Sequence, residues 1–238
     1  MKVDILAIGV HPDDIELSCS GYLLKEIDKG KKVALLDLTW GELGTRGNVQ
    51  IRKKEALASS KKMGAIGRDF LNIGDGFFES NAQNLKLIIS MVRKWQPTIV
   101  LANAEEDRHP DHARAAQLTA RACFLSGLIK ITTKYKGRTQ SAWRPKAVYH
   151  YIQDNPSKPD ILVDITGYID QKMELIKTFK SQFFDPKSKE PESPISSKEF
   201  LDYQIARAKV FGRYLQVPYA EGFTSARPVG VDSLFSIF

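Results

Sequence analysis

Short runs of apolar and β-branched residues alternate with stretches of helical periodicity through the first two-thirds of the chain. The runs predict strands at residues 3–10, 32–38, 70–73, 98–102, 147–152 and 161–165. Between them, apolar residues recur at helical spacing and predict helices at residues 15–28, 49–63, 84–95 and 111–128. Such alternation of strands and helices predicts a mostly parallel sheet that is covered by helices on both faces.

The pattern changes after Asp164. Two helical stretches, at about residues 168–183 and 199–215, flank a Pro-, Ser- and Lys-rich segment at 185–194, which we predict to be an exposed loop. The chain shows no internal repeat. We therefore expect a single domain over residues 1–238, of the α/β class and Rossmann-like, with a helical C-terminal part.

Composition and charge narrow the class of partner. The chain has 238 residues, of which 42% are hydrophobic and 26% charged, and this balance is typical of a folded globular protein. Its formal net charge of +7 could attract a nucleic acid, an anionic membrane surface or an acidic small molecule. The basic clusters, such as residues 52–54, are short and are not interleaved with aromatic residues, so we expect no nucleic acid partner. An acidic small substrate is the favoured interpretation.

The cysteines and the N-terminus indicate a compartment. Cys19 and Cys123 form no CxxC motif, and two cysteines are too few for a disulfide framework. The N-terminus enters a short strand without a long apolar leader, and no apolar stretch is long enough to span a bilayer. These features predict a cytoplasmic protein without a membrane partner.

Candidate chemistry is concentrated directly after two predicted strands. His11, Asp13 and Asp14 follow the first strand, and residues 107–112 follow the fourth, so that three of the four histidines lie in two motifs. If these strands are neighbours in a parallel sheet, His11, Asp14 and His112 could meet around one divalent cation at its carboxyl edge. Three protein ligands leave a coordination position open, as in catalytic zinc sites. A further carboxylate there could accept a proton from water.

Each motif also has a structural interpretation. Asp13 or Asp14 could cap the helix that begins near Ile15, and His109 with Pro110 could open another helix with proline at its first position. The occurrence of both motifs together favours a functional site. We interpret His150, which lies inside an apolar run, as a strand histidine and not as a ligand.

Three other classes of function are compatible with parts of the sequence. A dinucleotide-binding protein is disfavoured, because His-Pro-Asp-Asp stands where close approach to a pyrophosphate needs glycine, although Asp37 could contact a ribose hydroxyl. A metal-dependent phosphohydrolase would use similar ligands, commonly around two metal ions. A non-catalytic metal-binding module would keep the ligands without needing a free base. The last two interpretations stay open.

The two His/Asp motifs and the α/β pattern resemble the PIG-L/LmbE-like family of zinc-dependent N-acetylglucosamine deacetylases over nearly the whole chain. Further stretches resemble one branch, the bacillithiol-pathway enzymes that deacetylate N-acetylglucosaminyl-malate, at residues 38–47, 75–77, 181–183 and 217–223. Trp40 stands where many relatives have arginine, so the exact anionic substrate stays open.

The resemblance implies a function and a cofactor. The enzyme would remove the N-acetyl group from a small-molecule glycoside, with N-acetylglucosaminyl-malate as the first candidate. Another N-acetylglucosamine-containing small molecule and a phosphohydrolase substrate are the alternatives. One zinc ion per chain would bind to His11, Asp14 and His112, although this donor set also suits other divalent first-row metals. Relatives often form trimers or hexamers, which implies a homo-oligomer.

The resemblance also implies roles for further residues. Asp13 would be the general base. His109, held by the carboxylate of Asp111, would stabilise the developing oxyanion or protonate the leaving amine. A guanidinium binds a carboxylate through two parallel hydrogen bonds, and three arginines near the motifs are candidates to hold malate in this way: Arg46, Arg52 and Arg108.

Overall fold

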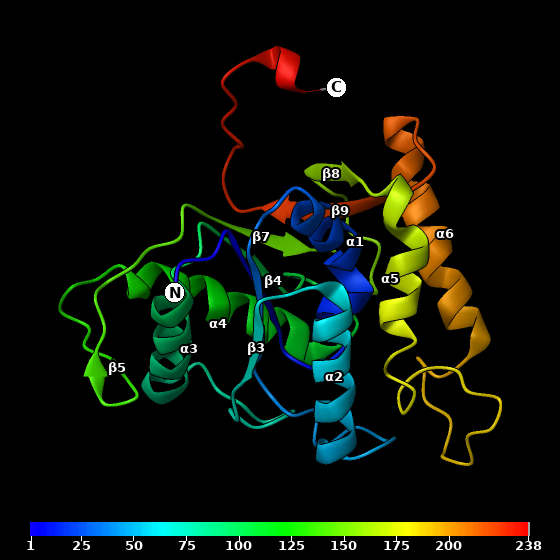
Figure 1. Ribbon diagram of the computed structural model, residues 1–238, viewed down its shortest axis with the longest axis horizontal. Coiled ribbons are helices and arrows are strands. Elements are labelled where there is room, and N and C mark those ends of the chain that lie inside the picture. The colour runs from blue at the N-terminus through cyan, green and yellow to red at the C-terminus, as the bar shows by residue number, and fades with distance from the viewer. Residues whose placement is uncertain (238) are drawn as a thin grey trace.

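The computed structural model describes residues 1–237, and a seven-stranded sheet forms its centre (Figure 1). The strands lie in the order β3-β2-β1-β4-β7-β9-β8. Their bounds are β1 Ile5–Gly9, β2 Val33–Asp37, β3 Gly67–Phe70, β4 Ile99–Ala102, β7 Ala147–Tyr151, β8 Ile161–Asp164 and β9 Ala220–Ser225. In this sheet β9 runs antiparallel to both of its neighbours, and the other strands run parallel to one another. The sheet is therefore mostly parallel, as predicted.

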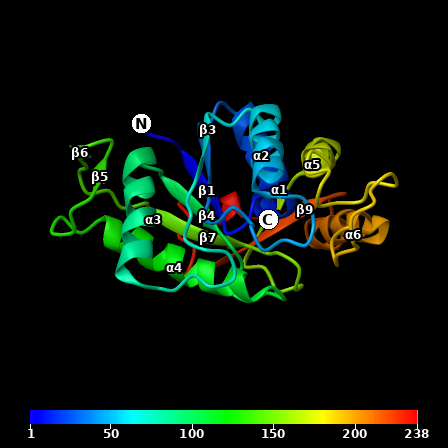
Figure 2. The same ribbon diagram turned by 90° about the horizontal axis from the view of Figure 1, so that it is seen from below.

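Helices cover both faces of the sheet (Figure 2). On one face lie α1 (Asp14–Asp28), α2 (Val49–Met63) and α5 (Ile169–Ile176), and on the other lie α3 (Ala82–Trp95) and α4 (Pro110–Ser126). The long helix α6 (Lys198–Leu215) packs against β8 and β9. The remaining elements are short: a hairpin of β5 (Lys134–Tyr135) and β6 (Arg138–Thr139), and the 3₁₀ turns η1 (Thr166–Tyr168) and η2 (Leu234–Ser236).

Strand β1 shows why both faces are covered. Every residue of this strand is buried, and successive side chains point to opposite faces. Leu6 and Ile8 belong to the core under α3 and α4, whereas Ile5 and Ala7 belong to the core under α1. Such a strand has no polar face to present to water, which is typical of the central strands of parallel α/β sheets.

The arrangement of β1 and β4 defines where a ligand can bind. The two strands pair in parallel, with Ile5 opposite Ile99 and Ala7 opposite Leu101. From β1 the chain builds the sheet outward through β2 and β3, and then returns to the other side of β1 with β4 and β7. The strand order therefore reverses between β1 and β4, and open α/β sheets bind their ligands in the crevice at this point. β1 and β4 are therefore neighbours, as the predicted site requires.

The main differences from the prediction concern β3, α5 and β9, and the short hairpin of β5 and β6 was not predicted either. Strand β3 begins at Gly67, three residues earlier than expected. The apolar pattern missed this start because Arg68 is buried in ion pairs and not in apolar contacts. The helix expected at 168–183 ends at Ile176, and the chain continues in turns that still bury Phe179 and Phe183. Strand β9 was not predicted. Within residues 1–237, no helix combines the length and apolar character needed to cross a bilayer.

Candidate active site

The turn between β1 and α1 places the first motif on a strained backbone. Asp13 precedes the first residue of α1 with φ 118° and ψ −25°. A residue other than glycine seldom adopts such a φ, and this kind of strain is concentrated at functional sites. The Asp13 side chain makes no capping hydrogen bond to the helix. The side chain of Asp13 therefore does not cap α1.

Asp14, the first residue of α1, is buried, and its two carboxylate oxygens have different surroundings. Oδ2 accepts hydrogen bonds from the backbone N–H groups of Val10 and His11 and from Nδ2 of Asn103, each 2.9 Å long. Oδ1 lies 3.1 Å from Nε2 of His112. One oxygen is thus held by the protein, and the other faces the histidine of the second motif.

The second motif lies at the start of α4 and is oriented by Asp107. Oδ2 of Asp107 lies 2.6 Å from Nδ1 of His112, and Oδ1 of Asp107 accepts a hydrogen bond from the backbone N–H of Asn155. Carboxylate–imidazole pairs of this kind orient metal-binding histidines. Although burial acts in the opposite direction, Asp14 and Asp107 raise the pKa of His112 to about 9. His112 is fixed with Nε2 toward Asp14.

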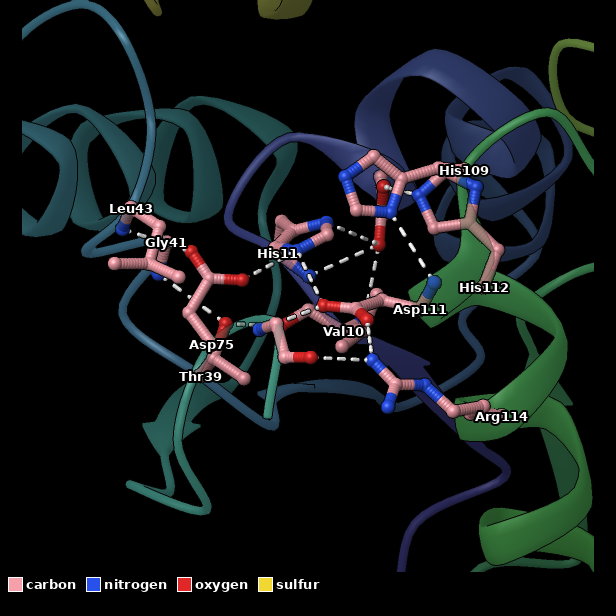
Figure 3. A network of polar contacts seen from close by, with 12 residues as sticks. Val10, His11, Thr39, Gly41, Leu43, Asp75, His109, Asp111, His112 and Arg114 are labelled. Atoms are coloured by element: carbon pink, nitrogen blue, oxygen red, sulfur yellow. Dashed lines mark hydrogen bonds and ion pairs between the residues drawn. The ribbon is translucent and has the colours of Figure 1, made fainter. Parts of the chain in front are cut away.

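His11 lies among further carboxylates (Figure 3). Its Nε2 is 2.9 Å from Oδ1 of Asp75 and 3.6 Å from Oδ2 of Asp111, and its Nδ1 is 3.9 Å from Oδ2 of Asp14. Burial lowers the pKa of His11, but the contacts with Asp111 and Asp75 outweigh burial and raise it to about 10. Both imidazoles therefore lie in strongly acidic surroundings, which favour positive charge at this place.

The donor set fits a divalent cation. Two groups of metal-competent side chains have donor atoms within 4.8 Å of one another: His11, His109 and His112, and His11, Asp75 and Asp111. Asp14 belongs to neither group, but its Oδ1 lies beside Nε2 of His112. The structure thus brings the three predicted ligands together, and imidazole nitrogens with carboxylate oxygens are donors that suit zinc and related metals.

Asp13 is buried beside Arg52, which extends from α2. Nη2 of Arg52 lies 3.3 Å from Oδ2 of Asp13, and its terminal nitrogens also donate to the carbonyl oxygens of Pro12 and Gly41, each at 2.9 Å. Gly41 has a φ of +64°, and a Cβ there would lie 2.1 Å from Nη1 of Arg52, so another residue would be strained and would displace the guanidinium. Burial raises the pKa of Asp13 to about 7, and Arg52 acts in the opposite direction. Arg52 is therefore a partner of Asp13.

His109 is not held by the carboxylate of Asp111. The backbone N–H of Asp111 donates to Nδ1 of His109 at 3.2 Å, whereas the carboxylate accepts from the backbone N–H of Gly76 and pairs with Arg114. Burial and the neighbouring His11 lower the pKa of His109. A neutral imidazole with Nδ1 as acceptor carries its proton on Nε2. The expected orienting contact is thus made by the backbone and not by the side chain.

The other two predicted arginines differ from Arg52 and from each other. Arg46 is buried, with Nη2 donating to Oγ of Ser188, and its Nε has no hydrogen-bond acceptor although Glu190 Oε2 lies 3.7 Å away. Arg108 is half-exposed and pairs with Asp154. Nε of Arg52 also lacks an acceptor, but the terminal nitrogens of Arg52 are already bonded to protein oxygens, so Arg46 has the guanidinium that is freer to meet a ligand.

One cavity of about 310 Å³ joins these groups. It is bordered by the His/Asp motifs, by all three arginines, and by apolar side chains of the segment that precedes and begins α6, including Ile195 and Phe200. Its volume and mixed lining suit a small molecule.

Four further residues of the site were not predicted from the sequence, although three of them share a signal, since each follows a strand of the sheet. Asn103 directly follows β4, Gln153 lies two residues after β7, and Asp75 lies in the loop after β3. Each therefore stands at the same carboxyl edge as the two motifs. Asp107 lies inside the second cluster, five residues before the histidine it orients.

Three comparisons place the chain among known proteins. The PIG-L family model, described as GlcNAc-PI de-N-acetylase, matches residues 6–123. A diacetylchitobiose deacetylase of Thermococcus kodakarensis is 30% identical over 189 residues, which are 75% of this chain and 70% of that protein. The crystal structure of a conserved protein of Thermus thermophilus matches with a TM-score of 0.86 and 31% identity, over 98% of both chains.

A fourth similarity shows the fold alone. A 4-carboxy-2-hydroxymuconate hydratase of Pseudomonas putida matches with a TM-score of 0.78 over 98% of this chain and 100% of the other, at 22% identity. The same fold therefore supports more than one reaction, and the reaction must be argued from the site.

The site lies where the strand order reverses between β1 and β4. It combines His11, His112 and Asp14, which could bind a metal, with the buried candidate base Asp13, and this combination is typical of a hydrolase. The chain belongs to the PIG-L family, and the protein is an N-deacetylase.

Proposed function

We propose that this N-deacetylase acts on an N-acetylglucosaminyl conjugate whose aglycone carries carboxylates, with N-acetylglucosaminyl-malate of bacillithiol biosynthesis as the substrate. The observation that carries the proposal is that one cavity contains both the His/Asp motifs and the buried guanidinium of Arg46. The de-N-acetylase family and the diacetylchitobiose deacetylase relative support chemistry on N-acetylglucosamine.

One zinc ion per chain would be held by ring nitrogens of His11 and His112 and by a carboxylate oxygen of Asp14. When bound, such an ion supplies Lewis acidity toward a carbonyl and lowers the pKa of water. The chain's own contribution is to orient the ligands, since Asp107 and Asp75 each bond a ring nitrogen of one histidine.

Asp13 is the proposed general base. It lies beside two of the ligands in sequence, it makes no capping bond, and Arg52 holds its carboxylate. His109 is the proposed donor to the oxygen of the acetyl group, because the backbone N–H of Asp111 occupies Nδ1 and leaves the proton on Nε2. Hydrogen bonds to the developing oxyanion contribute to rate when the donor is fixed in advance.

Arg46 is the proposed contact to the aglycone. The family resemblance and the net charge of +7 favour an anionic substrate group. Nε is buried without an acceptor in both Arg46 and Arg52, but the terminal nitrogens of Arg52 already bond Asp13 and two backbone carbonyls, whereas Arg46 donates through Nη2 to Ser188. An unsatisfied buried donor is costly, and a carboxylate oxygen would satisfy it.

The test is amine release from a panel of substrates: N-acetylglucosaminyl-malate, a neutral N-acetylglucosaminide, diacetylchitobiose and free N-acetylglucosamine. We expect the malate conjugate to have the highest kcat/KM. Arg46→Ala should raise the KM for this conjugate about 10-fold or more, because a charge-assisted bond is lost, and should leave free N-acetylglucosamine nearly unchanged.

Arg108→Ala is the matched control, because Arg108 is half-exposed and paired with Asp154. Equal activity on neutral and anionic conjugates would reject the carboxylate-bearing aglycone and leave an N-acetylglucosaminide deacetylase of another specificity. Absence of amide hydrolysis with every substrate, in protein that holds zinc, would instead support a metal-binding module.

A further inference from the structure

The side chain of Gln153 lies between two of the proposed metal ligands. It is 4% exposed and borders the cavity. Its Nε2 is 3.2 Å from Oδ1 of Asp14 and 3.3 Å from Nε2 of His112. Gln153 lies outside the family motifs of this sequence. The buried guanidinium of Arg207 donates to the backbone carbonyl of Gln153.

The orientation of the Gln153 amide is determined by its surroundings. Its Oε1 accepts bonds from the backbone N–H of Ala104 and from Nδ2 of Asn103, each 3.0 Å long. A backbone N–H can only donate, so the reverse orientation of the amide would place two donors against each other. The NH₂ group of Gln153 must therefore point toward Asp14 and His112.

Asn103 completes a closed ring of hydrogen bonds around Asp14. Its Nδ2 donates both to Oδ2 of Asp14, at 2.9 Å, and to Oε1 of Gln153. Oδ2 also receives two backbone N–H groups, so it is saturated, whereas Oδ1 receives only the side chains of Gln153 and His112. Two amides that follow β4 and β7 thus hold one carboxylate at the start of α1.

We propose that Asn103 and Gln153 form an amide clamp that fixes the Asp14 carboxylate with Oδ1 toward the metal position, so that Gln153 is a positioning residue for metal binding. The clamp rests on the metal site of the proposed function. It acts through Asp14 and does not need contact with substrate. Groups that bond to metal ligands commonly contribute 10–100-fold to metal affinity.

The test measures zinc affinity by competition with a chromophoric chelator. Gln153→Met keeps the length of the side chain and removes its hydrogen bonds, and we expect zinc affinity to fall about 10–100-fold. Cobalt bound to the variant should also show a changed visible absorption spectrum, because the freed carboxylate alters the ligand geometry. Gln140→Met is the matched control, since this glutamine bonds the carbonyl of Ser90 on α3 and borders no part of the cavity.

A double-variant cycle keeps the proposal falsifiable if one variant is unstable. If Asn103 and Gln153 act as one unit, Asn103→Leu with Gln153→Met should lose little more affinity than the more affected single variant. Additive losses, or an unchanged affinity of folded Gln153→Met, would overturn the clamp. A wild-type protein that binds no divalent ion would reject the metal site itself, which is a separate failure.

Discussion

Asp13 separates backbone strain from chemistry in a single residue. Its φ of 118° is a property of the turn, whereas the proposed proton transfer belongs to the carboxylate. Two substitutions that both remove the carboxylate can therefore differ in stability for a reason unrelated to the reaction.

We predict that Asp13→Gly is more stable than Asp13→Ala by about 1 kcal/mol, because glycine adopts a positive φ without strain. Within a helix the order of stability is usually the reverse, because alanine is more favourable there than glycine. Denaturant unfolding of the two variants measures the difference, and neither should deacetylate at a significant rate. An Asp13→Ala variant as stable as Asp13→Gly would contradict a strained turn.

The individual site residues show what a sequence can reveal. The motifs around His11 and His112 could be predicted because their residues are close in sequence and follow strands. The roles of the arginines could not, because they depend on which neighbours the fold supplies: Arg52 meets Asp13, and Arg108 meets Asp154. Likewise, the carboxylate of Asp111 was expected at His109 and instead bonds the loop after β3 and the neighbouring turn of α4.

At the scale of elements, an ion-pair network joins β2, β3 and α1 within the core. Arg68 of β3 donates to both carboxylate oxygens of Asp37, at 2.6 and 2.8 Å, and to Glu16 of α1 at 2.6 Å. All three side chains are fully buried. The network explains the displaced β3, because a hydrophobic pattern cannot detect a strand whose buried residue is charged.

We predict that Arg68→Met destabilises the protein by about 3–5 kcal/mol at pH 7, because it leaves buried carboxylates without a partner. Burial raises the pKa of Asp37 to about 6 even though Arg68 acts in the opposite direction. An acid with a folded-state pKa above its unfolded value gains a proton on folding, so its contribution to stability rises as the pH falls.

The variant should therefore recover part of its loss between pH 7 and pH 5, relative to the wild-type protein. Denaturant unfolding at several pH values measures this recovery. A loss that stays constant over this range would show that the carboxylates are hydrated in the variant and not buried without a partner.

Strand β9 could not be predicted from its residues. Its sequence Ala-Glu-Gly-Phe-Thr-Ser contains a glycine and a buried Glu221, and neither is typical of a central strand. Glu221 accepts the backbone N–H groups of Gly21 and Tyr22 within α1 and pairs with the buried Lys172 of α5. These contacts are long-range, so no local pattern indicates them. The strands with continuous apolar runs, by contrast, lie close to their predicted bounds.

At the scale of the whole molecule, we propose that several copies of the chain associate, as trimers or hexamers by analogy with relatives. Large apolar side chains are mostly exposed at three separate positions of the chain, Phe77, Ile129 and Phe235. Single exposed apolar residues are also common on monomers, so the proposal rests on the analogy. Light scattering coupled to size exclusion should give a mass near three or six times 26.8 kDa. A monomer at micromolar concentration would contradict the analogy.

The position of β9 has a consequence for the synthesis of the protein on the ribosome. The proposed ligands are all translated by residue 112, but the sheet receives its antiparallel strand only when residues 220–225 emerge, on the order of 10 s later at usual rates of elongation. Until then β7 and β8 lack the strand that lies between them, and Lys172 lacks its counter-ion. The nascent chain must therefore hold an open sheet edge during translation, where a chaperone or premature pairing with another chain can act.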